Sequence, residues 1–111
     1  MHRAPSDTPP EGRGFVAIYR WKVEPEHENA FRDRWHQTTL AGRRLGAFGS
    51  CLTRDEAGDF VAIALWPSEE ARAAAFTAMG PQEPWLGAQR VNETKLLVED
   101  DLWINSPFSS R

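Results

Sequence analysis

Two hydrophobic periodicities alternate along the chain, and together they predict four strands and two helices. Strands are expected where aromatic and β-branched residues dominate short runs, at residues 15–23, 47–54, 59–66 and 93–103. The turn DEAG at residues 55–58 lies between the second and third runs, so these two runs are predicted to form a hairpin.

The first predicted helix follows the first strand. Pro25 suits the first turn of a helix, because its ring fixes a helical φ angle and the N–H that it lacks would have no partner there. Gly46 is expected to end the helix. An apolar stripe at helical spacing runs along this segment and comprises His27, Phe31, Trp35, Thr38, Gly42 and Leu45.

The second predicted helix follows the third strand. Ser68 is expected to cap its N-terminus ahead of two acidic residues, and Gly80-Pro81 is expected to end it. Its apolar stripe is predicted to consist of small residues, Ala71, Ala74, Ala75 and Ala78. A further short helical turn is expected within residues 82–90, around Trp85.

The order of elements, β-α-β-β-α-β, predicts an α+β fold of the ferredoxin-like type, in which both helices cover one face of a four-stranded antiparallel sheet. With 111 residues, the chain is long enough for one core of this kind. We expect a flexible arm at residues 1–14, a folded domain at residues 15–103 and a tail at residues 104–111.

Side chains of a strand alternate between the two faces of a sheet, so parity separates the faces. One face, expected beneath the helices, carries Phe15, Ala17, Tyr19, Trp21, Phe60, Ala62, Ala64 and Trp66. The opposite face carries Val16, Ile18, Val61, Ile63 and Leu65. Two helices cover only one face, and an exposed apolar patch of this kind usually marks an interface. We therefore predict a homodimer joined through the second face, the alternative being a tail folded over it.

Large aromatic residues stand beside alanines on the face beneath the helices, and the second helix offers mostly alanine. Small residues that face small residues either let the layers pack closely or leave a cavity with aromatic walls. A cavity would suit a flat aromatic molecule, with Phe31, Trp35 and Thr38 contributed by the first helix. Tyr19 is the best-placed polar group, either to hydrogen-bond a substrate phenol and relay its proton or as a core tyrosine bonded to the backbone.

Charge and composition exclude several classes of function. A net charge of −3 argues against a nucleic-acid-binding surface, and no apolar run approaches the roughly 18 residues that a membrane span needs. Because residues 1–13 show no secretory signal, the protein is expected to be cytoplasmic. The single cysteine, Cys51, excludes an internal disulfide and is expected to be a buried, inert thiol.

Histidines and carboxylates show no spacing on one element that is typical of a metal site, so no metal is predicted. His27 is expected to cap the first helix or to lie at the surface, the alternative being a base at the mouth of the cavity. His36 falls about half a helical turn from the apolar stripe and is expected to face solvent.

Three segments of the chain resemble the antibiotic-biosynthesis monooxygenase (ABM) family: FVAIYRWKVEPEHENAFRDRW, GAFGSCLTRDEAGDFVAIALW and WPSEEARAAAF. The resemblance covers residues 15–103. It implies a dimeric α/β barrel, in which two ferredoxin-like subunits are joined by their sheets. Characterised relatives oxidise aromatic phenols or anthrones with O₂ and without metal or flavin, while others in the superfamily degrade haem or act on quinols. On this resemblance we expect no cofactor.

The resemblance also implies roles for individual residues. Trp66 matches a tryptophan that lines the pocket of the polyketide-oxidising members. Ala62 and Arg72 stand where those members have an asparagine and a tyrosine. Tyr19 stands where haem-degrading members have an asparagine, and their tryptophan position falls near Ala75. Those members also have a histidine soon after the tryptophan, and residues 68–90 contain none, which argues against haem degradation.

Three functions stay open: a cofactor-independent monooxygenase of a small aromatic, phenolic or quinol substrate, a small-molecule-binding protein without turnover, and a dimeric scaffold with a closed interior. The enzyme is the favoured prediction, with Tyr19 and Trp66 as its catalytic residues. Its predicted substrate-binding residues are Ala17, Trp21, Phe31, Trp35, Thr38, Phe60, Ala62 and Ala64. The expected partners are a small aromatic molecule and a second copy of the chain.

Overall fold

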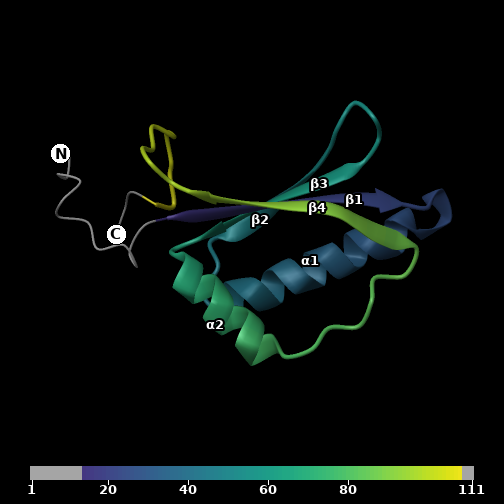
Figure 1. Ribbon diagram of the computed structural model, residues 1–111, viewed down its shortest axis with the longest axis horizontal. Helices are drawn as coiled ribbons and strands as arrows, with labels where there is room; N and C mark the ends of the chain where they lie inside the picture. Colours follow the sequence, from purple (N-terminus) through teal and green to yellow (C-terminus); the bar gives the residue numbers. More distant parts are fainter. Residues whose placement is uncertain (1–13, 109–111) are drawn as a thin grey trace.

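The computed structural model describes residues 14–108, which form one antiparallel sheet with two helices on one side of it (Figure 1). The elements are β1 (Phe15–Val23), the 3-10 turn η3 (Pro25–His27), α1 (Glu28–Arg44), β2 (Gly49–Arg54), β3 (Phe60–Trp66), α2 (Glu69–Met79) and β4 (Ala88–Leu97). The strands lie side by side in the order β2-β3-β1-β4, and every neighbouring pair is antiparallel. This arrangement confirms the predicted ferredoxin-like fold.

Local signals in the sequence set the beginning and end of both helices. Pro25 opens the turn that leads into α1, and α1 ends at Arg44, two residues before the predicted stop. The hydroxyl oxygen of Ser68 accepts a hydrogen bond of 3.0 Å from the backbone N–H of Ala71, as expected of an N-cap. Gly80 follows the last residue of α2. Leu45, predicted to belong to the apolar stripe, lies beyond the helix end and is exposed.

The core confirms the predicted division of the sheet into two faces. One cluster joins Phe15, Ala17 and Trp66 to Ala75 of α2, and a second cluster joins Trp21 and Phe60 to Phe31 of α1. All the strand residues in these clusters belong to the face expected beneath the helices. Tyr19 is half-buried and packs against both clusters. It therefore occupies the centre of the sheet, between the parts that the two helices cover.

The burial of α2 differs from the predicted alanine stripe. Ala75 is buried, but Ala74 and Ala78 are exposed, and the other buried residue of the helix is Arg72. An arginine can bury its long apolar stem when its guanidinium group finds partners. Tyr19 of β1 and Glu93 of β4 are such partners, and α2 turns Arg72 towards them.

The last strand begins earlier than predicted. It covers residues 88–97 and not 93–103, and the helical turn expected around Trp85 is absent from the described chain. Gly87 supplies a left-handed backbone (φ 67°), and its carbonyl oxygen accepts a hydrogen bond of 2.9 Å from the N–H of Glu24 at the end of β1. Pairing with β1 therefore starts directly after Gly87.

The other end of β4 is followed by a turn that displays apolar side chains. The carboxylate of Asp101 accepts hydrogen bonds from the Trp103 N–H and from the hydroxyl of Ser106, which is buried. Leu102, Trp103 and Ile104 are 91%, 70% and 97% exposed. This segment rises on the side of the sheet away from both helices (Figure 1).

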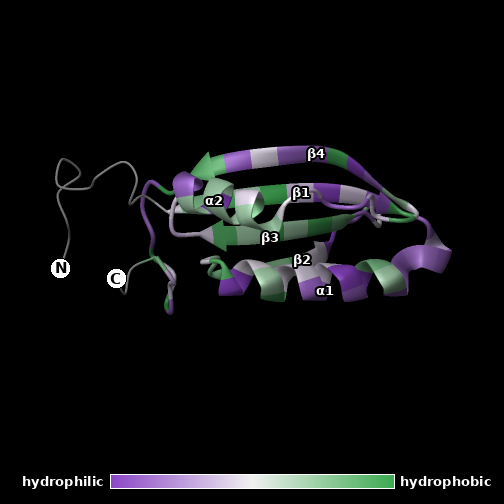
Figure 2. Cartoon of the chain, turned by 90° about the horizontal axis from the view of Figure 1, so that it is seen from below, coloured by the Kyte–Doolittle hydropathy of each residue, from purple (hydrophilic) through white to green (hydrophobic). Residues whose placement is uncertain are grey.

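Neither helix covers the outer face of the sheet, because both lie on the opposite side (Figure 1) and in front of the sheet when it is seen from the helix side (Figure 2). Its apolar residues, Val16, Ile18, Val61, Ile63 and Leu65, are half-buried by their neighbours in the sheet. Cys51 lies beside Ile63 on this face and is exposed, so the prediction of a buried thiol is wrong for the single chain. Its strand, β2, is an edge strand, and neither helix lies over this side of it.

Residues 1–13 of the predicted arm lie outside the described part of the chain, and the predicted domain boundaries stay predictions. Among the described residues, neither helix is long and apolar enough to cross a lipid bilayer. His36 is exposed on α1, as predicted.

Candidate functional site

A cavity of about 370 Å³ lies between the sheet and the helices. Most of its wall is aromatic or small and uncharged. The aromatic and long side chains that line it are Tyr19, Trp21, Trp35, Phe76, Met79, Gln82 and Trp85. The small residues that line it are Thr38, Thr39, Gly42, Ala47, Gly49, Ser50, Ala62, Ala64 and Gly80. The interior is therefore open, which argues against a scaffold that is packed shut.

Small residues on facing layers keep this space empty. Ala62 and Ala64 supply only methyl groups from β3, and Gly42 supplies no side chain from α1. The largest side chains of the wall are tryptophans. A hydrogen bond holds one of them in place, because the indole N–H of Trp35 lies 3.3 Å from the hydroxyl oxygen of Ser50. A cavity with aromatic walls of this kind suits a flat apolar ring system.

The structure brings together six of the predicted site residues and separates the others. Those that line the cavity are Tyr19, Trp21, Trp35, Thr38, Ala62 and Ala64. Those that pack in the core behind its wall are Ala17, Phe31, Phe60 and Trp66. Of this second group, Ala17, Phe60 and Trp66 lie on the helix-covered face as predicted, and Phe31 lies on α1. Packing between the sheet and the helices keeps all four side chains out of the cavity lining.

Trp66, predicted to be catalytic, is 4% exposed and packs with Phe15 and Ala75. Its ring meets the ring of Phe76 edge-on, with centroids 5.9 Å apart, and Phe76 in turn lines the cavity. Its indole N–H is buried and has no hydrogen-bond partner among the described residues. Trp66 thus supports the cavity wall from behind.

The polar end of the cavity is a cluster of four side chains from β1, α2 and β4. Nε and Nη2 of Arg72 lie 3.1 and 2.7 Å from the hydroxyl oxygen of Tyr19. The same Nη2 atom lies 2.7 Å from Oε2 of Glu93, and Nη1 of Arg90 lies 3.0 Å from Oε1. The Arg90 guanidinium is 4.7 Å from the ring centres of both Tyr19 and Trp21.

Strand register explains why β4 contributes to this cluster. Glu93 is directly opposite Tyr19, and Arg90 is opposite Trp21, because a register shift falls between Arg20 and Trp21. Residues opposite each other in antiparallel strands point to the same face. Both charged side chains therefore share the helix-covered face with the aromatic residues of β1.

Burial raises the pKa of Tyr19 above its ordinary value of 10.0, although the hydrogen bonds and the positive charge of Arg72 act in the opposite direction. The phenol is therefore neutral at physiological pH. Its oxygen accepts two hydrogen bonds from Arg72, and a hydroxyl group has two lone pairs and one proton. The proton of Tyr19 is thus left to donate to a further acceptor.

Arg72, Arg90 and Glu93 were not among the predicted site residues, although the family resemblance placed Arg72 where the polyketide-oxidising members have a tyrosine. For Arg72 a signal existed, because it is three residues before the buried Ala75 and seven before Met79, which places all three on one side of a helix. Arg90 and Glu93 of β4 gave no such signal. The face on which they lie depends on the pairing register of β4 with β1, and that register cannot be derived from the strand predicted at residues 93–103.

The loop between α2 and β4 closes one side of the cavity and is held by α1. Arg34 donates hydrogen bonds to the carbonyl oxygens of Pro84, at 2.7 Å, and Glu83. Its guanidinium is 4.7 Å from the ring centre of Trp85, which stacks on Trp21 with centroids 4.9 Å apart. This loop runs beside α1 from one end of the helical layer to β4 (Figure 1).

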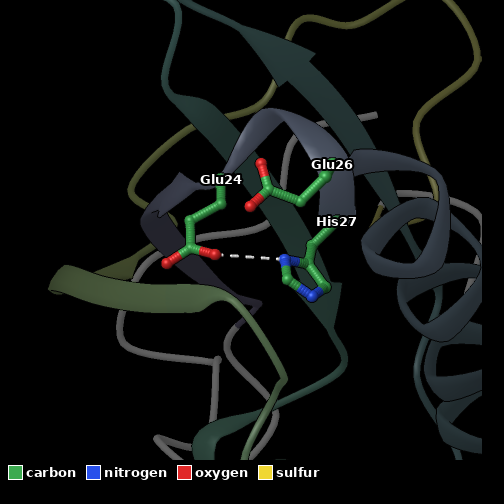
Figure 3. Close-up of side chains that lie close together, drawn as sticks. All are labelled: Glu24, Glu26 and His27. Atoms are coloured by element: carbon green, nitrogen blue, oxygen red, sulfur yellow. Dashed lines mark ion pairs between the residues drawn. The ribbon is translucent and has the colours of Figure 1, made fainter.

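A second group of titratable side chains lies where β1 meets α1. One ligand atom from each of Glu24, Glu26 and His27 lies within 4.8 Å of the others (Figure 3). Nδ1 of His27 is 3.2 Å from Oε1 of Glu24, and the imidazole packs closely against Gly87. Both glutamates are exposed, and such groups are common on surfaces without a metal. His27 lies outside the cavity lining, at the junction of β1 and α1.

Comparison with known proteins finds relatives among solved structures only. No protein-family model matches the chain, and no curated protein sequence matches it. The heme-degrading protein Rv3592 from Mycobacterium tuberculosis matches with a TM-score of 0.63 and 22% identity, over 83% of this chain and 98% of that one. SnoaB, a cofactor-independent oxygenase from Streptomyces nogalater, matches with a TM-score of 0.57 and 17% identity, over 84% and 98%.

A candidate antibiotic biosynthesis monooxygenase from Deinococcus radiodurans matches with a TM-score of 0.60 and 15% identity, over 83% of this chain and 99% of that one. Identities this low establish a shared fold and leave the activity open. The chain therefore has the α+β ferredoxin-like fold of the ABM-type monooxygenases, as its resemblance to that family implied.

Proposed function

We propose that the protein is a cofactor-independent monooxygenase that oxidises a small aromatic, phenolic or quinol substrate with O₂ in the cavity between sheet and helices. The observation that carries this proposal is an aromatic-walled cavity with a single phenol, Tyr19, whose proton is left free to donate because Arg72 occupies both of its lone pairs. SnoaB, which has the same fold, is described as a cofactor-independent oxygenase.

The arrangement provides much of what such a reaction needs. The aromatic walls hold a flat substrate in one orientation. The hydroxyl of Tyr19 donates a hydrogen bond to a substrate oxygen. The substrate's proton passes to the carboxylate of Glu93, which lines the same cavity, and the positive charge of Arg72 stabilises the anion that forms. An electron-rich anion can then react directly with O₂.

The reaction balances for an anthrone. The methylene carbon of the substrate loses both hydrogens and gains one oxygen atom of O₂, while the second oxygen atom leaves as water. The substrate is oxidised to a quinone and O₂ is reduced, so no other reductant takes part.

Oxygen uptake tests the proposal directly. With dithranol, a dihydroxyanthrone, we expect uptake above the rate without protein, and we expect Tyr19→Phe to lower that rate at least tenfold. Arg43→Gln, which changes an exposed arginine in the last turn of α1, is the matched control and should keep the full rate. If a panel of anthrones and hydroquinones quenches tryptophan fluorescence without oxygen uptake, the protein is a binder and the proposal is wrong.

We further propose that two copies associate through the outer face of the sheet. The apolar residues of that face are covered by neither helix. The segment that follows β4, which carries the exposed residues Leu102, Trp103 and Ile104, runs on the same side of the sheet (Figure 1). A second copy of the chain offers an identical apolar surface, so association would remove both surfaces from water.

A further inference from the structure

We propose that the cavity selects aromatic ligands that carry an anionic oxygen, such as a ring carboxylate, and that Arg72 and Tyr19 bind this oxygen together. The proposal takes from the proposed function only that the cavity is the substrate site. It adds the chemical class of the substrate.

The first argument is the charge of the cavity wall. Among the described residues, three charged side chains line the cavity, namely Arg72, Arg90 and Glu93. Each oxygen of the Glu93 carboxylate is taken by a different guanidinium group. Two positive charges thus share one negative charge, and the cavity carries an excess of +1, whereas the whole chain carries −3. A positively charged cavity in an acidic protein favours an anionic ligand.

The second argument is the position of Arg72. Its side chain is only 11% exposed, and a guanidinium group keeps its charge at every physiological pH. A buried charge is costly unless it is paired, and Arg72 shares its carboxylate partner with the more exposed Arg90. An anionic ligand would supply the second negative charge that Arg72 and Arg90 together lack.

The third argument is the supply of donors. The hydrogen bonds of Arg72 to described residues use Nε and Nη2, and none of them uses Nη1. The hydroxyl proton of Tyr19 is also available, because the Tyr19 oxygen only accepts hydrogen bonds from Arg72. Because Arg72 and Tyr19 are hydrogen-bonded to each other, their two remaining donors can bind the same carboxylate or ionised oxygen. Hydrogen bonds to a charged group are stronger than those between neutral groups.

The fourth argument is that the wall outside the charged cluster is uncharged. Its donors, the hydroxyls of Thr38, Thr39 and Ser50 and the amide of Gln82, bind an anion less strongly than a guanidinium group does. Ala62, opposite Tyr19 in the register, offers no polar atom, and the N–H of Trp35 is directed to Ser50. The aromatic walls therefore determine the flat shape of the ligand, while Arg72 and Tyr19 determine where its oxygen lies.

Equilibrium binding without turnover tests this inference. The probes are 2-naphthoate and its neutral counterpart 2-naphthamide, and dissociation constants are measured by tryptophan quenching and by calorimetry. We expect the folded wild-type protein to bind the carboxylate at least tenfold more tightly than the amide. Arg72→Met should reduce this ratio to about one, and Arg43→Gln should leave it unchanged.

Two further variants keep the test decisive if Arg72→Met does not fold. Arg72→Lys keeps a charge but loses the planar set of donors, and Tyr19→Phe keeps Arg72 but loses the hydroxyl proton, so each should lower the ratio several-fold. Equal affinity of the wild-type protein for both probes, or an unchanged ratio in all the Arg72 and Tyr19 variants that fold, would overturn the inference.

The outcome also separates this inference from the proposed function. A tenfold preference for naphthoate without oxygen uptake on any substrate contradicts the oxygenase and supports the anion site. Oxygen uptake with equal affinity for the two probes supports the oxygenase and contradicts the anion site.

Discussion

The Nη2 nitrogen of Arg72 lies 2.7 Å from the hydroxyl oxygen of Tyr19, although 53 positions separate the two residues. This contact ties α2 to the centre of the sheet. It also turns a tyrosine that could have been a plain core residue into a hydrogen-bond donor at the wall of a cavity. The candidate site therefore depends on a pair of residues from different elements and not on a local motif.

Tyr19 should titrate above pH 10 in the folded protein. Its pKa is raised chiefly by burial, and Glu93 adds to the rise, whereas Arg72 lowers the pKa. Tyr19 is the single tyrosine of the chain, so tyrosinate absorbance near 295 nm reports this one group. We expect Glu93→Gln to move the midpoint down and Arg72→Met to move it up. A wild-type midpoint at or below 10 would contradict the buried environment.

The same shift has a consequence for stability. The folded chain holds the tyrosine proton more tightly than the unfolded chain does. This contribution to the free energy of unfolding is therefore fully present below about pH 10 and is lost as the pH rises through the folded-state pKa. Between pH 9 and 12, the melting temperature of Tyr19→Phe should fall less steeply than that of the wild type. Parallel curves would show that Tyr19 titrates alike in both states.

A charge on the outer face of the sheet should break the proposed dimer. Ile18 and Ile63 are directly opposite each other on that face. Ile63→Asp would place a carboxylate in an apolar interface, where it has no partner. Light scattering should give about twice 12.6 kDa for the wild type and 12.6 kDa for this variant. Thr77→Asp, on the exposed side of α2, is the control and should remain dimeric. A wild-type mass of one chain rules the dimer out.

Removal of Arg34 should loosen the loop between α2 and β4. Arg34 bonds two carbonyl groups of this loop and lies over the ring of Trp85. Local opening exposes the backbone to proteases before the whole protein unfolds. Chymotrypsin should therefore cut after Trp85 or Leu86 several-fold faster in Arg34→Ala. Arg43→Ala serves as control, and similar cleavage rates for the two variants would show that the arginine does not hold the loop.

Loss of the helix cap at Ser68 should destabilise the protein by about 1 kcal/mol. The serine hydroxyl accepts the N–H of Ala71, and alanine has no acceptor to replace it. Chemical denaturation of Ser68→Ala measures this loss. Ser68→Asp retains an acceptor at the same place and should recover most of the stability, whereas equal losses in both variants would point to packing of the buried side chain as the cause.

The sequence by itself determined the features that depend on neighbouring residues. The bounds of β1, the hairpin turn and the Ser68 cap follow from the side chains within a few positions of each, because turns, caps and strand alternation are local. Parity along β1 and β3 was enough to separate the face that packs on the helices from the outer face. The fold class followed from the order of these elements.

Only the tertiary structure decided which residues form the site. Whether Arg72 points inward depends on how far α2 rotates to reach Tyr19 and Glu93, and the face of Glu93 depends on the register of β4 against β1. Trp66 and Phe60 belong to the predicted face, yet the helices pack on these two residues and leave the cavity beside Tyr19, Ala62 and Ala64. These outcomes are balances among contacts between distant segments, so no run of neighbouring residues contains them.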